Sequence, residues 1–167
     1  GDSLAAWMSR AGARRKVGPW HVMIVWTHAS GAADLDDRRN AVPLLSYDEI
    51  GQVFSPRLSN LHAWEGAVHL APERPVSGFV RFFQFLQAEA SPRVPGDPTI
   101  ANGGYPVAAN GQTEDLGHEI DAGLVFTTRE GAVLQVLAGV FEPGDAYEGT
   151  PARTAWEFEV RLDWQLP

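Results

Sequence analysis

Apolar and polar residues alternate with a period of two along much of the chain, most clearly from Thr154 to Leu166. Such alternation is typical of a β-strand with one apolar and one polar face, and it does not match the spacing of a helix. The run is long for a strand of a globular protein, where about five or six residues are usual. Its apolar positions are Trp156, Phe158, Val160, Leu162, Trp164 and Leu166.

The same alternation predicts further strands upstream. Residues 76–88 resemble a strand with aromatic residues on both faces, so the sequence leaves its orientation open, and residues 3–14 show the weakest pattern. With the C-terminal strand this makes about seven strands. The clearer upstream strands are residues 20–29, 61–70, 117–128 and 132–141.

Short and long connections alternate between these strands. The long ones are rich in Gly, Pro, Asn and Asp. Outer-membrane barrels have short periplasmic turns on one rim and long external loops on the other. The sequence therefore predicts an all-β, antiparallel up-and-down transmembrane β-barrel, with residues 1–167 as a single segment of it. The short connections are 16–19, 72–75 and 129–131, and the long ones are 31–60, 91–116 and 142–151.

The tryptophans agree with this prediction. Trp156 and Trp164 are eight residues apart on one face, which is about 26 Å along a strand at ~3.3 Å per residue. With a strand tilt of ~40°, this projects to roughly 20 Å, close to the apolar band between the aromatic girdles of a membrane barrel. Trp20, Trp156 and Trp164 are therefore the predicted girdle residues. The alternative is a soluble β-sandwich or ligand-binding barrel, in which the apolar positions point inward.

Strand parity bears on whether the barrel is complete. If the short turns are periplasmic, the last strand ends in the periplasm, and counting back about seven strands places the start of the first one outside. A complete bacterial barrel has an even number of strands. We therefore expect this chain to be part of a larger, even-stranded barrel, unless one strand is miscounted.

Composition and charge exclude several other classes of protein. The chain of 167 residues is long enough for one domain. Its net charge of −8 makes nucleic acid an unsuitable partner, because phosphate binding needs a basic surface. It has no cysteine, which removes disulfides and thiol nucleophiles. No apolar run is long enough for a membrane-spanning helix.

Two short runs resemble motifs of a known family. They are LGHEID at residues 116–121 and AGVFEPGD at residues 138–145, with further matches at 29–31 and 60–62. From Pro19 onward, the chain resembles the C-terminal region of the alginate-export family of outer-membrane β-barrels. The resemblance implies a large closed barrel in a Gram-negative outer membrane that passes a polysaccharide or another hydrophilic solute.

The polar alternates of the strands are the predicted lumen-lining residues. In a water-filled lumen, such charged rows tune ion selectivity, and they could equally hold the barrel's shape through salt bridges between strands. Carboxylates predominate among them, whereas the alginate exporter has an arginine-rich pore. The predicted lumen residues are Glu65, His69, Arg81, Glu119, Asp121, Gln135, Glu157, Glu159, Arg161 and Asp163.

Catalytic motifs are weak in this sequence. Gly1-Asp2-Ser3-Leu4 spells the nucleophile block of GDSL esterases, and Asp115 and His118 have the spacing of that family's second block. Those enzymes are α/β proteins with further oxyanion motifs, and neither feature is found here. We therefore expect a protein that is not an enzyme and needs no cofactor.

Two groups of residues have side chains that could bind a metal ion. Asp34, Asp36 and Asp37 could bind Ca²⁺ through carboxylate oxygens, but they lack the remaining features of an EF-hand loop. His62, Glu65 and His69 could bind zinc, but they do not share one face of a strand, because residues three apart point to opposite faces. We expect no metal site. The expected partners are the lipid bilayer, a hydrophilic solute and, in an alternative non-conducting role, other envelope proteins.

Overall fold

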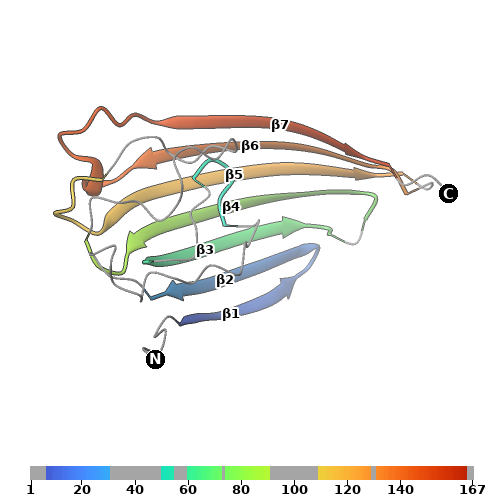
Figure 1. The fold of residues 1–167 in the computed structure, drawn as a ribbon. Helices are drawn as coiled ribbons and strands as arrows, with labels where there is room; N and C mark the ends of the chain where they lie inside the picture. The colour runs from blue at the N-terminus through green and yellow to red at the C-terminus, as the bar shows by residue number, and fades with distance from the viewer. Residues whose placement is uncertain are drawn as a thin grey trace, which may run out of the picture.

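The protein is a single antiparallel β-sheet, described from a computed structural model that covers residues 7–30, 50–54, 60–72, 74–90, 109–128 and 131–164. Each strand pairs with the next one along the chain, so the order in the sheet is β1-β2-β3-β4-β5-β6-β7 (Figure 1). The all-β, up-and-down architecture is thus confirmed. The strands are β1 (Met8–Val17), β2 (Trp20–Ala29), β3 (Leu61–Leu70), β4 (Val76–Gln87), β5 (Asp115–Thr127), β6 (Val133–Pro143) and β7 (Ala155–Asp163).

The alternation of short and long connections becomes two different ends of the sheet. Tight turns join β1 to β2, β3 to β4 and β5 to β6 at one end, which we call the short-turn end (Figure 1). The longer connections all lie at the other end, the long-loop end. One of them contains the short 3₁₀ helix η2 (Asp145–Tyr147).

The first strand differs from its prediction. The pattern predicted a strand over residues 3–14, whereas β1 continues to Val17, which pairs with Trp20. Only Gly18 and Pro19 form the turn, because Gly18 adopts a φ of +60° that a side chain would disfavour. The extension contains two basic residues, Arg15 and Lys16, so no apolar alternation marks it in the sequence.

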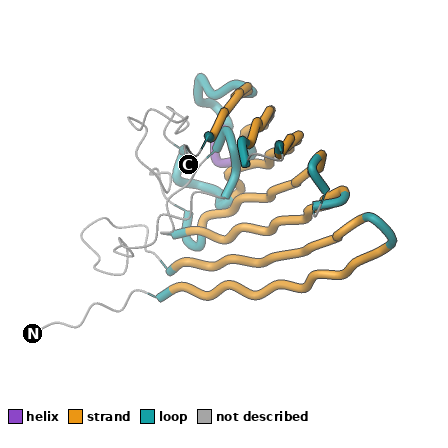
Figure 2. The backbone as a smooth tube through the Cα atoms, turned by 90° about the vertical axis from the view of Figure 1, so that its right-hand side faces the viewer, coloured by secondary structure: helices purple, strands orange, loops and turns teal. Residues whose placement is uncertain are grey.

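The sheet is twisted and curled, but it is not closed (Figure 2). β1 and β7 are its two edges, and they do not pair with each other in the described part of the chain. The described residues therefore form an open sheet, and the closed barrel predicted from the sequence is not observed. The described part of the chain forms seven strands, the number that the alternation predicted.

The two faces of the sheet differ in composition. On the face that we call the apolar face, large hydrophobic side chains such as Ile24, Val80 and Phe158 are exposed. The opposite face, the polar face, carries the charged alternates. At the long-loop end it is covered by residues 50–54 and η2, which bury a cluster that includes Phe54, Phe83, Phe85, Leu116, Phe141 and Tyr147.

The orientation of β4, left open by the sequence, is settled by its pairing. Arg81 lies opposite Asp121 of β5, so the odd-numbered residues of β4 belong to the polar face. Phe83 and Phe85 are therefore buried in the cluster, while Phe82 is exposed on the apolar face. Aromatic residues occur on both sides of β4 because one side packs in the cluster and the other side belongs to the apolar surface.

Candidate functional site on the polar face

The predicted lumen residues lie together on the polar face. In an antiparallel sheet, residues directly opposite each other project to the same side. One row across the sheet contains Arg81, Asp121 and Glu157, with Gly139 between the two carboxylates. A second row contains Glu65 and Glu119, separated by Phe83 of β4. Neighbouring rows hold His69, Gln135, Glu159, Arg161 and Asp163.

Basic residues of β1, beyond the predicted set, extend this face. A guanidinium nitrogen of Arg10 lies 3.5 Å from a carboxylate oxygen of Glu65. Arg14 hydrogen-bonds to the ring of His21 on β2. Lys16 shares this face because it follows Arg14 by two positions in the strand. The even spacing of Arg10, Arg14 and Lys16 was a usable signal. Arg10 and Arg14 lie in the predicted strand 3–14, whose pattern was the weakest, and Lys16 lies beyond its predicted end.

Positive and negative charges are therefore separated across the polar face. Arg10, Arg14 and Lys16 lie on the β1 edge. The carboxylates are concentrated on β5 and β7 at the other side of the sheet, where Arg161 is accompanied by acidic neighbours. This separation of charge was not predicted, since the sequence indicated mainly an excess of carboxylates.

Glu119 is a buried carboxylate that accepts hydrogen bonds from the backbone of another segment. Its side chain is fully buried, and it accepts hydrogen bonds from three consecutive backbone N–H groups, those of Gln52, Val53 and Phe54. The bonds from Val53 and Phe54 are 2.8 and 2.6 Å long. An ionised carboxylate accepting several backbone N–H groups is held by strong, charge-assisted hydrogen bonds. Glu119 thus anchors a segment from the connection between β2 and β3.

Asp121 is also buried, two positions along the same strand. A guanidinium nitrogen of Arg81 lies 3.2 Å from its carboxylate. The same guanidinium lies over the rings of Phe79 and Phe83, with its central carbon 4.8 and 5.4 Å from their centroids. Arg81 is therefore held by an ion pair and by cation–π contacts together. These contacts fix the position of the guanidinium.

The charged row on β7 is more accessible. Arg161 contacts the carboxylate of Glu159 at 3.0 Å, and both side chains are partly exposed. The side-chain amide of Gln52 donates a 3.1 Å hydrogen bond to Glu159. These groups are available to interact with ions or hydroxyl groups near the edge of the sheet.

The predicted girdle residues lie at both ends of the apolar face. Trp20 begins β2 and Trp164 follows β7, so both are at the short-turn end, while Trp156 lies at the long-loop end. All three side chains are exposed. Trp7 and Trp64 are also exposed toward the long-loop end. Exposed tryptophans thus occur near both ends of the strands.

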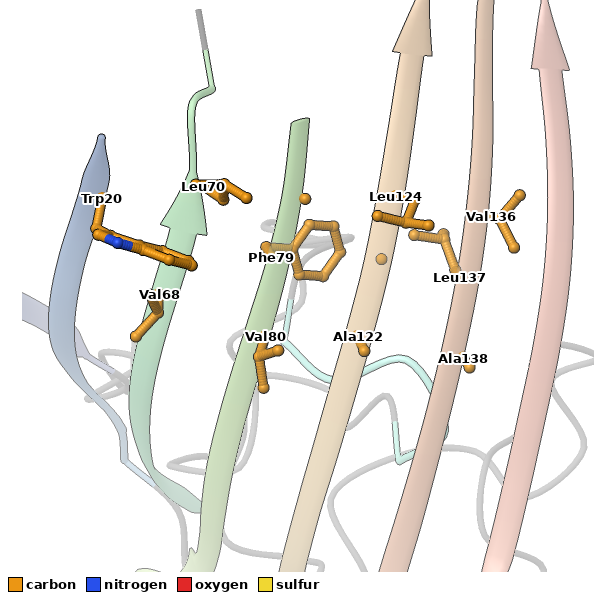
Figure 3. A pocket seen from close by; sticks show the side chains of 12 residues that line it. Trp20, Val68, Leu70, Phe79, Val80, Ala122, Leu124, Val136, Leu137 and Ala138 are labelled. Carbon is orange, nitrogen blue, oxygen red and sulfur yellow. The ribbon is translucent and has the colours of Figure 1, made fainter. Parts of the chain in front are cut away.

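A shallow apolar hollow of about 430 Å³ lies in the sheet toward the short-turn end (Figure 3). Trp20, Val68 and Leu124 are among the side chains around it. Gly78 and Gly123 also line it, together with Phe79 and Leu137, which alternate to the polar face. Almost no polar group contributes to it, which suits an apolar occupant and no charged one.

The candidate catalytic and metal residues do not converge. Asp115 accepts hydrogen bonds from Gln84 and from the backbone of Gly117, whereas His118 lies 3.4 Å from Glu142. His62 lies on the apolar face, opposite to Glu65. In the described ranges, no group of three or more His, Asp or Glu residues is arranged to hold a metal ion. Ser3 and the Asp34, Asp36 and Asp37 group lie outside the described residues.

Comparison with known proteins provides no family or relative for this chain. No family model matches the sequence, and no curated protein matches it significantly. Within the described part of the chain, no helix is long and apolar enough to cross a membrane.

Proposed function

We propose that this sheet is part of a closed β-barrel of the alginate-export type in a Gram-negative outer membrane, and that it forms a conduit for a polysaccharide or another hydrophilic solute. One observation carries the proposal: the sheet buries charge on one face and exposes apolar side chains on the other. Glu119 and Asp121 are 0% and 1% exposed, while Ile24 and Val160 are 54% and 57% exposed. This distribution is typical of a barrel with a polar interior and lipid around it.

The apolar face supports a lipid bilayer as the partner. Soluble monomers rarely expose a continuous apolar surface of this extent. A soluble ligand-binding barrel would instead point its apolar positions toward the covered face, which here carries the charges. Exposed tryptophans near both ends of the strands match the aromatic girdles of membrane barrels.

A conducting role is the first choice because the polar face carries charges of both signs along its length. The alternative is a non-conducting barrel that scaffolds an envelope complex, and the observation favouring it is the cover over the long-loop end formed by residues 50–54 and η2. Single-channel recording of the full natural protein in planar bilayers separates the two. Discrete conductance steps are expected, and a purified, folded protein that gives none would support the scaffold instead.

Charge reversal on either side of the polar face should shift ion selectivity in opposite directions. Replacing Glu157 and Asp163 with lysine should move the reversal potential in a KCl gradient toward anion selectivity. Replacing Arg10 and Arg14 with glutamate should move it toward cation selectivity, because rings of charged side chains select ions in a pore. Glu119 is left intact because it holds backbone N–H groups. Unchanged reversal potentials in both double variants would show that this face does not line the path of the ions.

The two sheet edges lead to a separate expectation. An unpaired backbone N–H or C=O group in hydrocarbon costs several kcal/mol, so β1 and β7 need partner strands in a membrane. We expect residues 1–167 alone to lack a heat-resistant folded band on SDS gels, and the longer natural protein to show one. A heat-resistant band from these residues at monomer mass would mean that the sheet closes on itself.

A further inference from the structure

The segment Ile50–Phe54 lies across the polar face and contacts four strands. Phe54 packs against Phe85 of β4 and stacks on Phe141 of β6, with ring centroids 4.9 and 4.6 Å away. Glu119 of β5 receives the backbone N–H groups of residues 52–54. The side-chain amide of Gln52 reaches Glu159 of β7. A segment far from these strands in sequence is thus attached to the face proposed to line the conduit.

Gly139 of β6 forms the seat for this segment. A Cβ atom at this position would lie 2.8 Å from a methyl carbon of Val53, 3.2 Å from the Cβ atom of Gln52 and 2.6 Å from a carboxylate oxygen of Asp121. All of these distances are shorter than ordinary van der Waals contact. Only a residue without a side chain therefore lets the segment approach the sheet this closely.

The segment also has the backbone shape that its anchor requires. Gly51 has a φ of +77°, in the left-handed region that favours glycine. Consecutive N–H groups turned toward one point form a concavity that binds an anion. Here the anion is the side chain of Glu119, which belongs to the same chain. The contact is therefore an internal clamp and leaves no open site for a ligand.

We infer that Ile50–Phe54 is a restriction segment, held across the polar face by the Glu119 clamp and the Gly139 seat, which limits the size of the solutes that pass. This inference rests on the proposed conduit. It assigns size selection to the clamp and the seat, separately from the charged residues of β1 and β7 that we expect to govern ion selectivity.

Two variants release the segment by independent routes. Glu119→Gln removes the charge and places an amide nitrogen among the backbone donors, which weakens the clamp. Gly139→Val leaves Glu119 in place but fills the seat, where the new side chain also presses on the Asp121 carboxylate, and valine is favourable in a strand. For each variant of the full natural protein, uptake of neutral sugars of increasing size into proteoliposomes is measured. Hydrogen exchange at the amides of residues 52–54 is followed in parallel.

Both variants should speed exchange at residues 52–54 and should raise the uptake of the larger sugars severalfold, with little change for the smallest. Matched controls are Glu142→Gln, which makes the same change on the exposed apolar face, and Gly66→Val, where no atom lies within 4 Å of an added Cβ. Neither control should change the size limit. Folding is checked by the exchange protection of the strands.

The possible failures point to different parts of the argument. If the parent protein passes sugars and the released variants show the same size limit, the restriction segment is disproved while the conduit stands. Amides that stay protected in both folded variants would equally overturn the inference, because the clamp and the seat would not be what holds the segment. A parent that passes no sugar and no ion would refute the conduit itself, and the size limit with it.

Discussion

Replacing Val160 with arginine is expected to lower the free energy of unfolding by about 2–4 kcal/mol when the protein is refolded in lipid vesicles. Val160 lies midway between Trp156 and Trp164 on the apolar face. If those tryptophans mark the two interfaces, Val160 is near the middle of the bilayer, where a guanidinium must leave water. Denaturant titration of the folded protein in vesicles, followed by tryptophan fluorescence, measures the change.

Glu159→Arg is the control for Val160→Arg, because it places the same new charge on the opposite face of β7. Glu159 is one position away, on the polar face, and it receives a hydrogen bond from Gln52. Glu159→Arg loses that bond, which contributes about 1 kcal/mol in a typical case, and the partly exposed ion pair with Arg161, which contributes about 0–1 kcal/mol, but it keeps the new charge on the polar side. If Glu159→Arg proved more damaging than Val160→Arg, the apolar face would be the one that faces a protein core, and the membrane assignment would be wrong.

Replacing Arg81 with methionine is expected to destabilise the protein by about 3–5 kcal/mol, because it leaves a buried carboxylate without its partner. Arg81 contacts Asp121 at 3.2 Å, and the Asp121 side chain is almost fully buried. Methionine preserves much of the packing against Phe79 and Phe83, so the loss reports mainly on charge. Chemical denaturation of the refolded protein measures it.

A double variant tests this explanation. Adding Asp121→Asn to Arg81→Met removes the unpaired charge and should recover most of the lost stability. Arg161→Met is the matched control, since its ion pair with Glu159 is partly exposed and such pairs contribute about 0–1 kcal/mol. If the double variant were as unstable as Arg81→Met alone, the packing of the guanidinium on the aromatic rings, and not its charge, would be what stabilises this site.

The sequence predicted strands most accurately where one face of the strand is apolar and the other face is polar. In β5, Glu119 and Asp121 alternate with Ile120 and Ala122, and the structure sorts them to opposite faces as predicted. The direction of a side chain from a strand depends only on its own position, with a period of two. For this reason the polar face could be assembled residue by residue without knowledge of the neighbouring strands.

The pattern was less informative where a strand does not have two contrasting faces. β1 is largely polar beyond Ser9, and its end at Val17 is determined by its pairing with β2. β4 has aromatic residues on both sides, and only its register with β5 assigns them. In both strands the deciding partner lies in another segment, so local alternation contains too little information.

Strand periodicity and turn residues are local properties, so the strands and the short turns at one end could be predicted from the sequence. The alternation also indicated which side chains share the polar face. What those side chains do depends on their tertiary contacts. Glu119 could be placed on the face from its position in β5, but its donors are 65 to 67 residues away along the chain. Such a contact depends on how a distant connection folds back onto the sheet, and no periodicity encodes it.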